Sequence, residues 1–592
     1  MSRPTRRPAA RSLRGSSQVR LRMGLIFLTM VLSLFGARLV QLQGLDPQAY
    51  AARAESEGLV SVPLEATRGD ITDRHGVPLA RSAAGLMVVA DPQRTSDDAE
   101  AIARLLANKL GVDYFDTLER LRKPDTRFQY IAREVPAAKA TRVVDAIEAA
   151  GYEGLDTRPD PLREYPAHDV AANLVGFMGN GDDAAPSGAG LELAFGDLLA
   201  GKDGKETYEV GGGTRIPLGE NTEIKPIDGK DLRLTIDRDV QWYAQRVLRT
   251  AVQGVRAESG VAIALDTRTG EILALADYPT FDANDISEAP RRNLRTRALS
   301  DVYEPGSVEK VLTGAALIDQ GLVSPRTRIT VPGELPVMDR VIHDYFDHGN
   351  LRLTFAGVIA KSSNIGTVLA ARQIDHKTLG RYLDSFGLGH RTGIGIPGES
   401  RGLVPDPDSW TDLTQATISF GQGISVNALQ MAAAVNTIAN GGEFVSPSLV
   451  KGSARTDGGD LVGTDTTTRH RVVSRQTARQ VTHMMEMVTT EGAGTAPQVA
   501  IPGYRVAGKT GTAQQVGEHC GCYDGSLAVS FAGFAPADQP RFTVYVVIQR
   551  PEAPAGGGST AGPVVRQILN YLLQKYAVPP TGTRPAHLPV EW

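Results

Sequence analysis

The chain contains 592 residues, of which 41% are hydrophobic and 22% are charged, a composition typical of a globular protein. This length is sufficient for several domains and a large hydrophobic core. The net charge of −4 excludes a nucleic-acid-binding role for the chain as a whole, because such a role requires a strong excess of Lys and Arg.

The start of the chain combines a basic tail with one long apolar run. Residues 1–22 contain seven arginines and no acidic residue, and the apolar run begins at Met23. The run spans a membrane if Arg38 extends its charged end to the surface. We therefore expect a cytoplasmic tail at 1–22 and one transmembrane anchor at 23–42, with the remainder outside. A cleaved signal peptide is the alternative, but residues 38–41 lack the small residues of a cleavage site.

The region from residue 58 to residue 225 reads as an α+β domain without visible chemistry. Its pattern predicts a strand at 85–90 and helices at 98–110 and 137–150. The Arg74-His75-Gly76 sequence predicts a turn between two strands. The composition becomes polar around residues 224–231, where we place the domain boundary. We expect this first domain to be a non-catalytic pedestal that is large enough to bind partner proteins.

The region from residue 226 to residue 577 predicts an antiparallel sheet with helices at both ends and a helical middle. An amphipathic helix is expected at 237–256 and a β-hairpin at 261–275. Three further strands and a closing helix are expected at 505–514, 528–535, 542–549 and 561–576. The fold class is therefore α+β. The last residues, 578–592, are rich in proline, and we expect a flexible tail there.

Ser307 follows Pro305 and Gly306 and precedes an apolar helical run, so it is expected at a helix N-terminus. Lys310 lies three residues on, which puts both side chains on one face. A neutral lysine amine can take the proton of a serine hydroxyl and so create a nucleophile. The pair alone is a weak signal, because Ser-x-x-Lys occurs by chance in a chain of this length.

Two further motifs strengthen the signal. Lys361-Ser362-Ser363-Asn364 and Lys509-Thr510-Gly511-Thr512 follow in that order, and the ordered set is the signature of penicillin-binding proteins and serine β-lactamases. From residue 23 to about 576 the chain resembles the class B penicillin-binding proteins, which are membrane-anchored peptidoglycan D,D-transpeptidases. The form Tyr303-Glu304-Pro305-Gly306 and the Gly421–Ser425 stretch resemble their division-specific, FtsI-type branch.

The resemblance implies a role for each motif residue. Ser307 is the expected acylated nucleophile and Lys310 its base. Ser362 is placed to relay a proton to the leaving amine, and Asn364 to hold Lys310 and the substrate amide. The substrate's terminal carboxylate is expected at the last motif, where the substrate-binding residues are Lys509, Thr510, Gly511 and Thr512. The backbone N–H groups of Ser307 and Thr512 are the expected oxyanion hole.

The resemblance also implies a substrate, partners and a location. The substrate is the D-Ala-D-Ala end of peptidoglycan stem peptides, and β-lactams acylate the same serine. The residue 58–225 domain then matches the family's pedestal, or dimerisation-type, domain, and the fold of residues 226–577 is serine β-lactamase-like. The implied partners are a polymerase of the FtsW (SEDS) type and other division proteins, at the septum of the bacterial cytoplasmic membrane. No metal or organic cofactor is required, because serine, lysine and backbone dipoles suffice.

Alternative functions are an elongation- or sporulation-type transpeptidase, a β-lactamase or carboxypeptidase that transfers the acyl group to water, and a division scaffold or β-lactam receptor. A long pedestal and an anchor argue against a β-lactamase, which needs neither.

Three smaller features carry expectations of their own. The His343–His348 segment resembles a metal cluster, but its setting in a turn favours a structural role. Cys520 and Cys522 are the only cysteines, and they are expected to form a loop staple or to remain inert thiols outside the cytoplasm. Glu309 is expected to be solvated or paired with an arginine rather than to act as a base.

Overall fold

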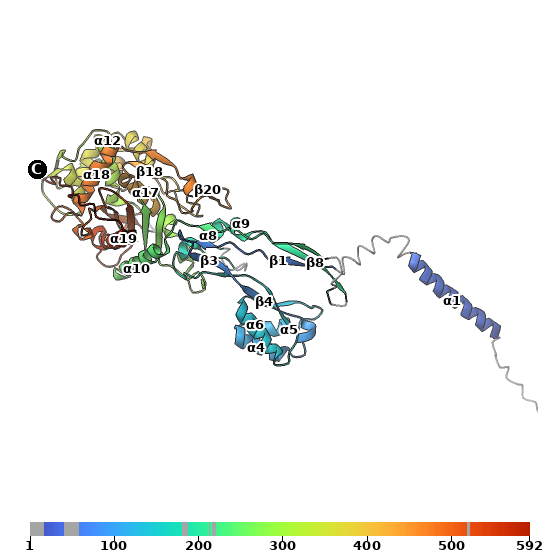
Figure 1. Cartoon of the computed structure of the whole chain (residues 1–592). Coiled ribbons are helices and arrows are strands. Elements are labelled where there is room, and N and C mark those ends of the chain that lie inside the picture. Colours follow the sequence, from blue (N-terminus) through green and yellow to red (C-terminus); the bar gives the residue numbers. More distant parts are fainter. Residues whose placement is uncertain (1–16, 41–58, 180–187, 212–213, 216–220, 518–520) are drawn as a thin grey trace, which may run out of the picture. The chain divides into compact units, whose positions relative to one another are not determined.

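The computed structural model describes residues 17–40, 59–179, 188–211, 214–215, 221–517 and 521–592. Most of the expected basic tail and the segment after the anchor therefore lie outside the described residues. The chain divides into two compact units, Met1–Glu65 with Asp203–Ile227, and Ala66–Lys202 with Asp228–Trp592. Each unit is described on its own below (Figure 1).

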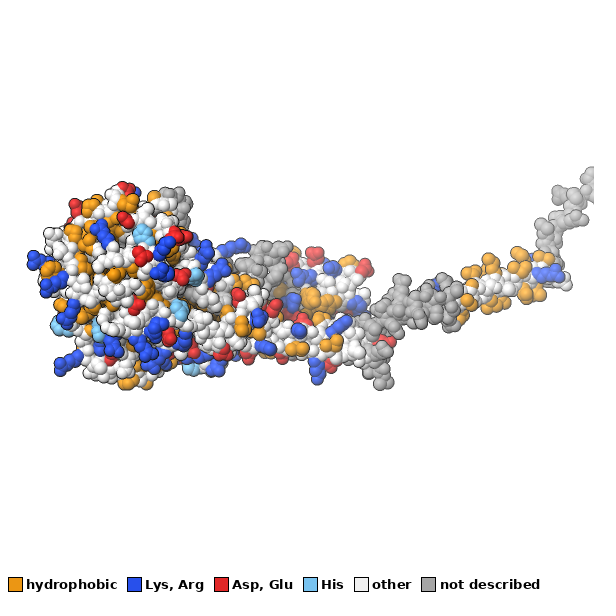
Figure 2. Space-filling model, turned by 90° about the horizontal axis from the view of Figure 1, so that it is seen from above, with side chains coloured by type: hydrophobic (Ala, Val, Ile, Leu, Met, Phe, Trp, Pro, Cys, Tyr) orange, Lys and Arg blue, Asp and Glu red, His pale blue; other side chains and the backbone are white. Residues whose placement is uncertain are grey.

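The first unit holds one long helix and a small sheet. Helix α1 (Ser17–Val40) is the one described helix that is long and apolar enough to cross a membrane. Its 24 residues span about 36 Å, more than the ~30 Å of a bilayer core. Hydrophobic side chains cover the face of this helix that Figure 2 shows. The sheet pairs β1 (Leu59–Leu64) and β10 (Thr222–Ile224) with β8 (Gly204–Gly211), and β9 (Thr214–Arg215) also pairs with β8.

The second unit begins with two small sheets. One has the order β11-β2-β3-β7, and the other has the order β5-β4-β6. Helices α4 and α6 cover the second sheet, and their apolar side chains form a separate small core with it. The bounds of these elements are β2 Ile71–Thr72, β3 Pro78–Ala83, β4 Gly85–Ala90, α4 Ala99–Leu110, α5 Tyr114–Leu121, β5 Gln129–Pro136, α6 Ala137–Glu148, β6 Leu155–Pro159, β7 Leu162–Glu164 and β11 Leu232–Arg233.

A buried ion-pair cluster joins three separate segments of this region, at Arg68, Arg163 and Glu192. The Glu192 carboxylate is 1% exposed and accepts hydrogen bonds from Arg68 Nε at 2.8 Å and Arg163 Nε at 2.7 Å. Glu192 lies on the short helix α8 (Gly190–Ala194). Because removing one partner of a buried ion pair leaves an uncompensated charge, these three residues are mutually dependent.

The rest of the second unit is built on a five-stranded antiparallel sheet in the order β13-β12-β24-β23-β22. Helices α10 and α19 pack on this sheet and on each other, and α17 packs on β12 and β24 from the helical middle of the domain. The bounds are α10 Arg238–Gly254, β12 Ser259–Asp266, β13 Ile272–Tyr278, α17 Ala428–Ala439, β22 Ala507–Val516, β23 Tyr523–Ala535, β24 Phe542–Gln549 and α19 Gly562–Lys575. The predicted fold class and sheet are confirmed.

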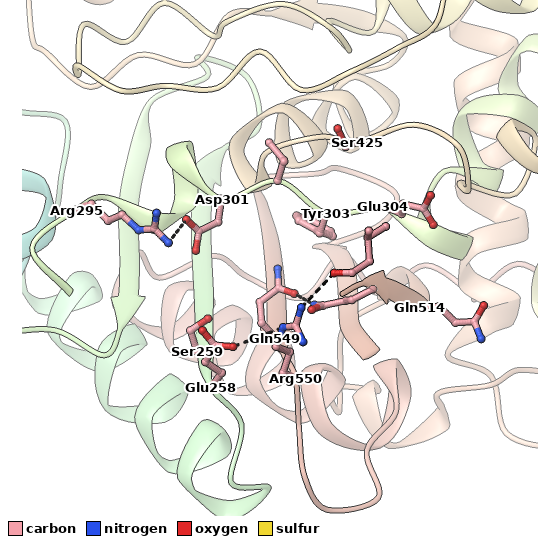
Figure 3. Close-up of a pocket in the computed structure, with 13 residues that line it drawn as sticks. Glu258, Ser259, Arg295, Asp301, Tyr303, Glu304, Ser425, Gln514, Gln549 and Arg550 are labelled. Carbon is pink, nitrogen blue, oxygen red and sulfur yellow. Dashed lines mark hydrogen bonds and ion pairs between the residues drawn. The ribbon is translucent and has the colours of Figure 1, made fainter. Parts of the chain in front are cut away.

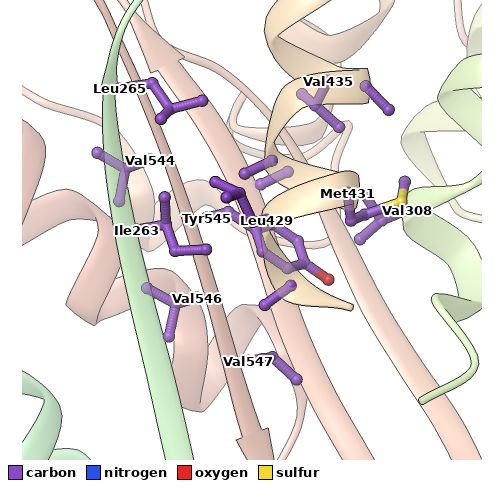
Figure 4. Packing of buried hydrophobic residues seen from close by; sticks show 14 of the residues in the cluster. Ile263, Leu265, Val308, Leu429, Met431, Val435, Val544, Tyr545, Val546 and Val547 are labelled. Carbon is purple, nitrogen blue, oxygen red and sulfur yellow. The ribbon is translucent and has the colours of Figure 1, made fainter. Parts of the chain in front are cut away.

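The helical middle surrounds α12 (Lys310–Asp319), which begins directly after a 3-10 turn at Gly306–Val308. Residues 310–318 are all buried, so this helix is enclosed on every side. Helix α17 is also buried at every position. Figure 4 shows Met431 of α17 beside Val308, while Leu429 lies beside Tyr545 of β24. The core therefore fixes the 3-10 turn against the sheet. The neighbouring helices are α13 Phe355–Ala360, α14 Asn364–Ala371, α15 His376–Ser385 and α18 Arg475–Val488.

The expectation of a flexible tail at 578–592 is wrong for its last residues. The backbone of β17 (Leu351–Thr354) hydrogen-bonds to Val590 at 3.0 Å and Trp592 at 3.1 Å, as an added strand would. A Cβ at Gly357 would lie 1.9 Å from the Val590 carbonyl oxygen, so this glycine allows the close approach. The proline content obscured the binding because proline removes backbone donors, whereas the tail acts here partly as an acceptor.

Trp592 anchors this tail, and we expect Trp592→Ala to lower the melting temperature. Its indole Nε1 donates to the Leu353 carbonyl at 3.1 Å, and the guanidinium groups of Arg328 and Arg352 lie 5.0 and 5.5 Å from the ring centroid. Loss of these contacts should cost about 1–2 kcal/mol, measured by thermal unfolding. The control is Trp242→Ala, which removes a half-exposed indole from α10 and should cost less. Equal melting temperatures for Trp592→Ala and wild type would contradict the anchor.

Candidate active site

Ser307 lies on the 3-10 turn before α12, where the chain approaches the edge strand β22 closely. Gly306 has φ +56°, and a Cβ there would lie 3.1 Å from Ala513 Cβ and 3.2 Å from the Thr512 carbonyl oxygen. Gly306 N also donates to the Gly421 carbonyl at 2.9 Å. Glycine is therefore required on both conformational and steric grounds. The half-buried Ser307 side chain is in this way fixed beside the last motif.

Lys310 begins α12 and is 0% exposed. Its Nζ donates to the Ser362 carbonyl at 2.6 Å and to Asn364 Oδ1 at 2.7 Å. Burial lowers the pKa of Lys310 to about 7, although the carboxylates of Asp344 and Glu309 act in the opposite direction. A large share of Lys310 is therefore unprotonated at neutral pH, as a base that activates a hydroxyl must be.

Ser362 lies between two buried lysines. Its φ is +59°, a left-handed conformation that costs a residue with a side chain about 1–2 kcal/mol. This conformation turns its carbonyl to Lys310, while its hydroxyl accepts a 2.8 Å hydrogen bond from Lys509 Nζ. The strained backbone of Ser362 thus allows this one residue to bind both Lys310 and Lys509.

Lys509 lies on β22 and is 0% exposed. Its Nζ also donates to the Thr510 carbonyl at 3.0 Å. Burial, and then the neighbouring Lys310 ammonium, lower the pKa of Lys509 well below its usual value. An anion that arrived here would relieve this mutual repulsion, so the site favours a carboxylate ligand.

The rest of the last motif contributes small and hydroxylated residues. A Cβ at Gly511 would lie 2.2 Å from Ser530 Oγ and 2.9 Å from Val308 Cγ2, so a larger residue would displace the serine turn. The side chain of Thr512 is exposed and that of Thr510 is nearly buried. Gly557 N donates to Thr512 Oγ1 at 3.5 Å.

The structure thus brings the three motifs together between the edge of the sheet and the helical middle. The connection is direct: Lys310 contacts Ser362 and Asn364, and Ser362 contacts Lys509. The predicted residues that meet here are Ser307, Lys310, Ser362, Asn364, Lys509, Thr510, Gly511 and Thr512.

The expectation of a solvated Glu309 is wrong. Glu309 is 0% exposed, and its Oε1 accepts a 2.7 Å hydrogen bond from Thr313 Oγ1. Its Oε2 is buried without a hydrogen-bond partner among the described residues. Burial raises the pKa of Glu309 well above its usual value. The sequence did contain a signal for this burial, because apolar residues lie on all sides of the helix that follows. The position of Glu309 next to Lys310 obscured that signal.

Sequence reasoning also missed the importance of Asp344. The sequence favours a structural role for the His343–His348 segment, and in the structure the Asp344 side chain lies fully buried under the Ser362–Asn364 turn. The described residues contain no group of three or more His, Cys, Asp or Glu that could hold a metal. The available signal was the short distance in sequence between this segment and the second motif.

A pocket of about 350 Å³ lies beside the segment that leads into the serine turn. Figure 3 shows Arg295 and Asp301 paired on one side of it, at 2.9 Å, while Arg550 extends from the end of β24. Glu304, which precedes the serine turn, also lines this pocket. Because most of these charges are already paired with one another, the pocket has no single dominant charge.

The β22–β23 hairpin extends over this region. Tyr523 OH donates to Glu304 Oε2 at 2.9 Å, and the same carboxylate accepts from Gly423 N at 2.9 Å. Cys522, the residue before Tyr523, is disulfide-bonded, and the other cysteine, Cys520, lies outside the described residues. The hairpin is therefore tied to the loop that supports Ser307.

Comparison with known proteins gives the same assignment for both regions of the chain. Residues 260–570 match the penicillin binding protein transpeptidase domain, and residues 63–234 match the penicillin-binding protein dimerisation domain. The chain therefore belongs to the class B penicillin-binding proteins, and it is a peptidoglycan D,D-transpeptidase.

Individual relatives match over most of their length. The chain is 36% identical to the penicillin-binding protein PbpB of Mycolicibacterium smegmatis, over 96% of this chain and 92% of PbpB. It is 33% identical to the peptidoglycan D,D-transpeptidase FtsI of Escherichia coli, over 92% and 89%, and 30% identical to the stage V sporulation protein D of Bacillus subtilis, over 95% and 86%. The crystal structure of Mycobacterium tuberculosis penicillin-binding protein 3 with aztreonam superposes with a TM-score of 0.68, at 31% identity, over 89% of this chain and 100% of that chain.

We expect Glu309→Met to stabilise the protein. Burial raises its folded-state pKa well above the usual value for a glutamate, so the cost of burying this acid grows as the pH rises above the unfolded-state pKa. Methionine has a similar length and no charge, and Thr313 can turn its hydroxyl to a helix carbonyl. Thermal unfolding should show a gain of about 1 kcal/mol that is larger at pH 8 than at pH 5.

Glu491→Met, at an exposed position, is the matched control and should change little. A Glu309→Met protein that melts below wild type at pH 8 would show that the buried carboxyl group has a stabilising partner.

Proposed function

We propose that Ser307 is the acylated nucleophile of the transpeptidase reaction and that Lys310 is its base. Neutral Lys310 takes the Ser307 Oγ proton as Oγ attacks the carbonyl carbon of the penultimate D-alanine of a stem peptide. The new C–O bond forms, and the C–N bond to the terminal D-alanine breaks. The proton passes to the leaving amine through the Ser362 hydroxyl. Backbone N–H groups of Ser307 and Thr512 stabilise the oxyanion, typically by about 3 kcal/mol for each donor.

In the second step, an amine of a neighbouring stem peptide attacks the ester carbonyl. A new amide bond forms, the C–O bond to Ser307 breaks, and the amine proton returns to Ser307 Oγ. Lys509 and Thr512, with Thr510, bind the donor's terminal carboxylate, and Gly511 allows the strand to approach. Asn364 holds Lys310 and the substrate amide.

The observation that supports this assignment most strongly is the position of Ser362 between Lys310 and Lys509. A proton relay needs a hydroxyl within hydrogen-bond reach of its neighbours, and Lys509 Nζ lies 2.8 Å from Ser362 Oγ. The Lys310 amine is held 2.6 Å from the carbonyl of the same residue. The proposed reaction needs no metal or cofactor, because serine, lysine and backbone dipoles suffice.

The cellular role that we propose is cross-linking of septal peptidoglycan during division. The Tyr303-Glu304-Pro305-Gly306 form of the serine motif supports this role, together with the FtsI relative. In this proposal α1 anchors the protein in the bacterial cytoplasmic membrane with its N-terminus inside. Residues 58–225 form the pedestal, residues 226–577 form the catalytic domain, and an FtsW-type polymerase and other division proteins are partners. Similarity to a sporulation protein makes sporulation the second candidate, and a fluorescent fusion seen at mid-cell in growing cells would favour division.

Labelling with a fluorescent penicillin tests the nucleophile. We expect wild-type protein to form an adduct on the peptide that carries Ser307, and Ser307→Ala to form none. The adduct should last for hours, because a transpeptidase transfers its acyl group poorly to water. Gel fluorescence and peptide mapping measure both properties. Release within seconds would favour a β-lactamase or carboxypeptidase, and an adduct that survives Ser307→Ala would contradict the assignment.

The pKa of Lys310 predicts the pH dependence of acylation. Because burial lowers this pKa to about 7, the base is mostly protonated below pH 7 and mostly neutral above it. The acylation rate constant should therefore rise with pH to a plateau, with its midpoint near pH 7, in labelling time courses from pH 5 to pH 9. Lys310→Arg keeps the charge but cannot lose its proton, and should lower the plateau about 10²–10⁴-fold. A rate that still rises steeply at pH 9 would contradict the lowered pKa.

A further inference from the structure

Asp344 lies directly beneath the turn that carries Ser362 and Asn364. Its carboxylate is 0% exposed. Oδ1 accepts hydrogen bonds from Asn364 N at 2.5 Å and Ile365 N at 3.0 Å, and Oδ2 accepts from Ser363 Oγ at 2.7 Å. The two N–H groups belong to the first turn of α14, where a negative charge is favourable. This one carboxylate therefore fixes the backbone on which Asn364 stands.

A fourth donor reaches Asp344 from His348. The imidazole is 4% exposed, and its Nε2 lies 3.0 Å from Asp344 Oδ2. Its Nδ1 lies 2.5 Å from the Gly349 carbonyl oxygen, which only accepts, so Nδ1 carries a proton. Asp344 already accepts from three other donors, which favours its ionised form, and an ionised Asp344 requires Nε2 to donate to it as well. This geometry fits an imidazolium form of His348.

This pair belongs to the set of charges around Lys310. Glu309 directly precedes Lys310 at the start of α12, Lys509 comes from β22, and Asp344 and His348 come from the loop before β17. Asn364 connects Lys310 to the segment that carries Asp344, because its Oδ1 accepts from Lys310 and its Nδ2 donates to the His343 carbonyl at 2.9 Å. The Asp344 carboxylate favours the charged form of Lys310, and the imidazolium partly offsets it.

We propose that Asp344 and His348 form a buried ion pair that positions the Ser362–Asn364 turn and sets the electrostatic potential at the Lys310 amine. Both are therefore positioning residues for acyl transfer. This inference rests on the proposed role of Lys310 as the base. Asp344 acts through Asn364, and His348 acts through Asp344. Neither residue contacts the substrate in this proposal.

The test compares Asp344→Asn with His348→Gln in the full-length protein in detergent, by the pH dependence of acylation with a fluorescent penicillin. Asp344→Asn removes a negative charge, so the midpoint should move to lower pH, and the plateau should fall roughly a hundredfold as the turn loses its position. His348→Gln leaves the carboxylate uncompensated, so the midpoint should move to higher pH. Shifts in opposite directions are the signature of this ion pair.

The controls change the same charges at exposed positions of the same segment. Asp347→Asn and His343→Gln should retain the wild-type midpoint and plateau, because water and salt screen exposed charges. If Asp344→Asn does not fold, as judged by thermal unfolding, the upward shift in His348→Gln decides the question, because that variant keeps the carboxylate and its other three donors.

Unchanged midpoints in folded variants, even with lower plateaus, would overturn the proposal and leave the pair a purely structural role. That result differs from a failure of the proposed function. In the latter case the wild type itself would show no Ser307-dependent adduct or no midpoint near pH 7.

Discussion

The burial of two lysine amines on either side of one serine is the constraint that organises this domain. Lys310 and Lys509 are both 0% exposed, and burying a cation without acceptors costs several kcal/mol. The acceptors come from the Ser362–Asn364 turn, which gives a carbonyl and an amide oxygen to Lys310 and a hydroxyl to Lys509. The left-handed backbone of Ser362 is what lets one residue serve both sides.

The surrounding fold holds the serine turn close to strand β22, as this arrangement requires. β22 is the edge strand of the sheet, so its outer side is available to the serine turn. Two glycines, Gly306 and Gly511, remove the side chains that would hold the turn and strand apart. Helix α17 is buried at every position and fills the space between the sheet and α12. The core thus holds the serine turn and β22 in fixed positions relative to each other. A site built on flexible loops would be positioned less precisely.

Much of this could be predicted from the sequence, because local patterns determined it. The apolar periodicity located the helices and the strands of the sheet within a few residues, and the ordered motifs identified the residues that meet. Long-range contacts could not be predicted in this way. The charge of Glu309 suggested a solvated side chain, and the prolines near Trp592 suggested a flexible tail. Asp344 owes its importance to hydrogen-bond donors from another segment of the chain. The roles of the motif residues stay predictions.

The two carboxylates near Lys310 differ in the number of hydrogen-bond donors around them. Asp344 accepts hydrogen bonds from Asn364 N, Ile365 N and Ser363 Oγ, and His348 Nε2 lies 3.0 Å from its Oδ2. Glu309 accepts one hydrogen bond, from Thr313, and burial raises its pKa well above its usual value. The two buried amines beside them, Lys310 and Lys509, both have lowered pKa values. In the proposed mechanism, a substrate carboxylate at Lys509 would favour the protonated form of Lys509 and the neutral form of Lys310. Substrate binding would then favour the form of Lys310 that acylation requires.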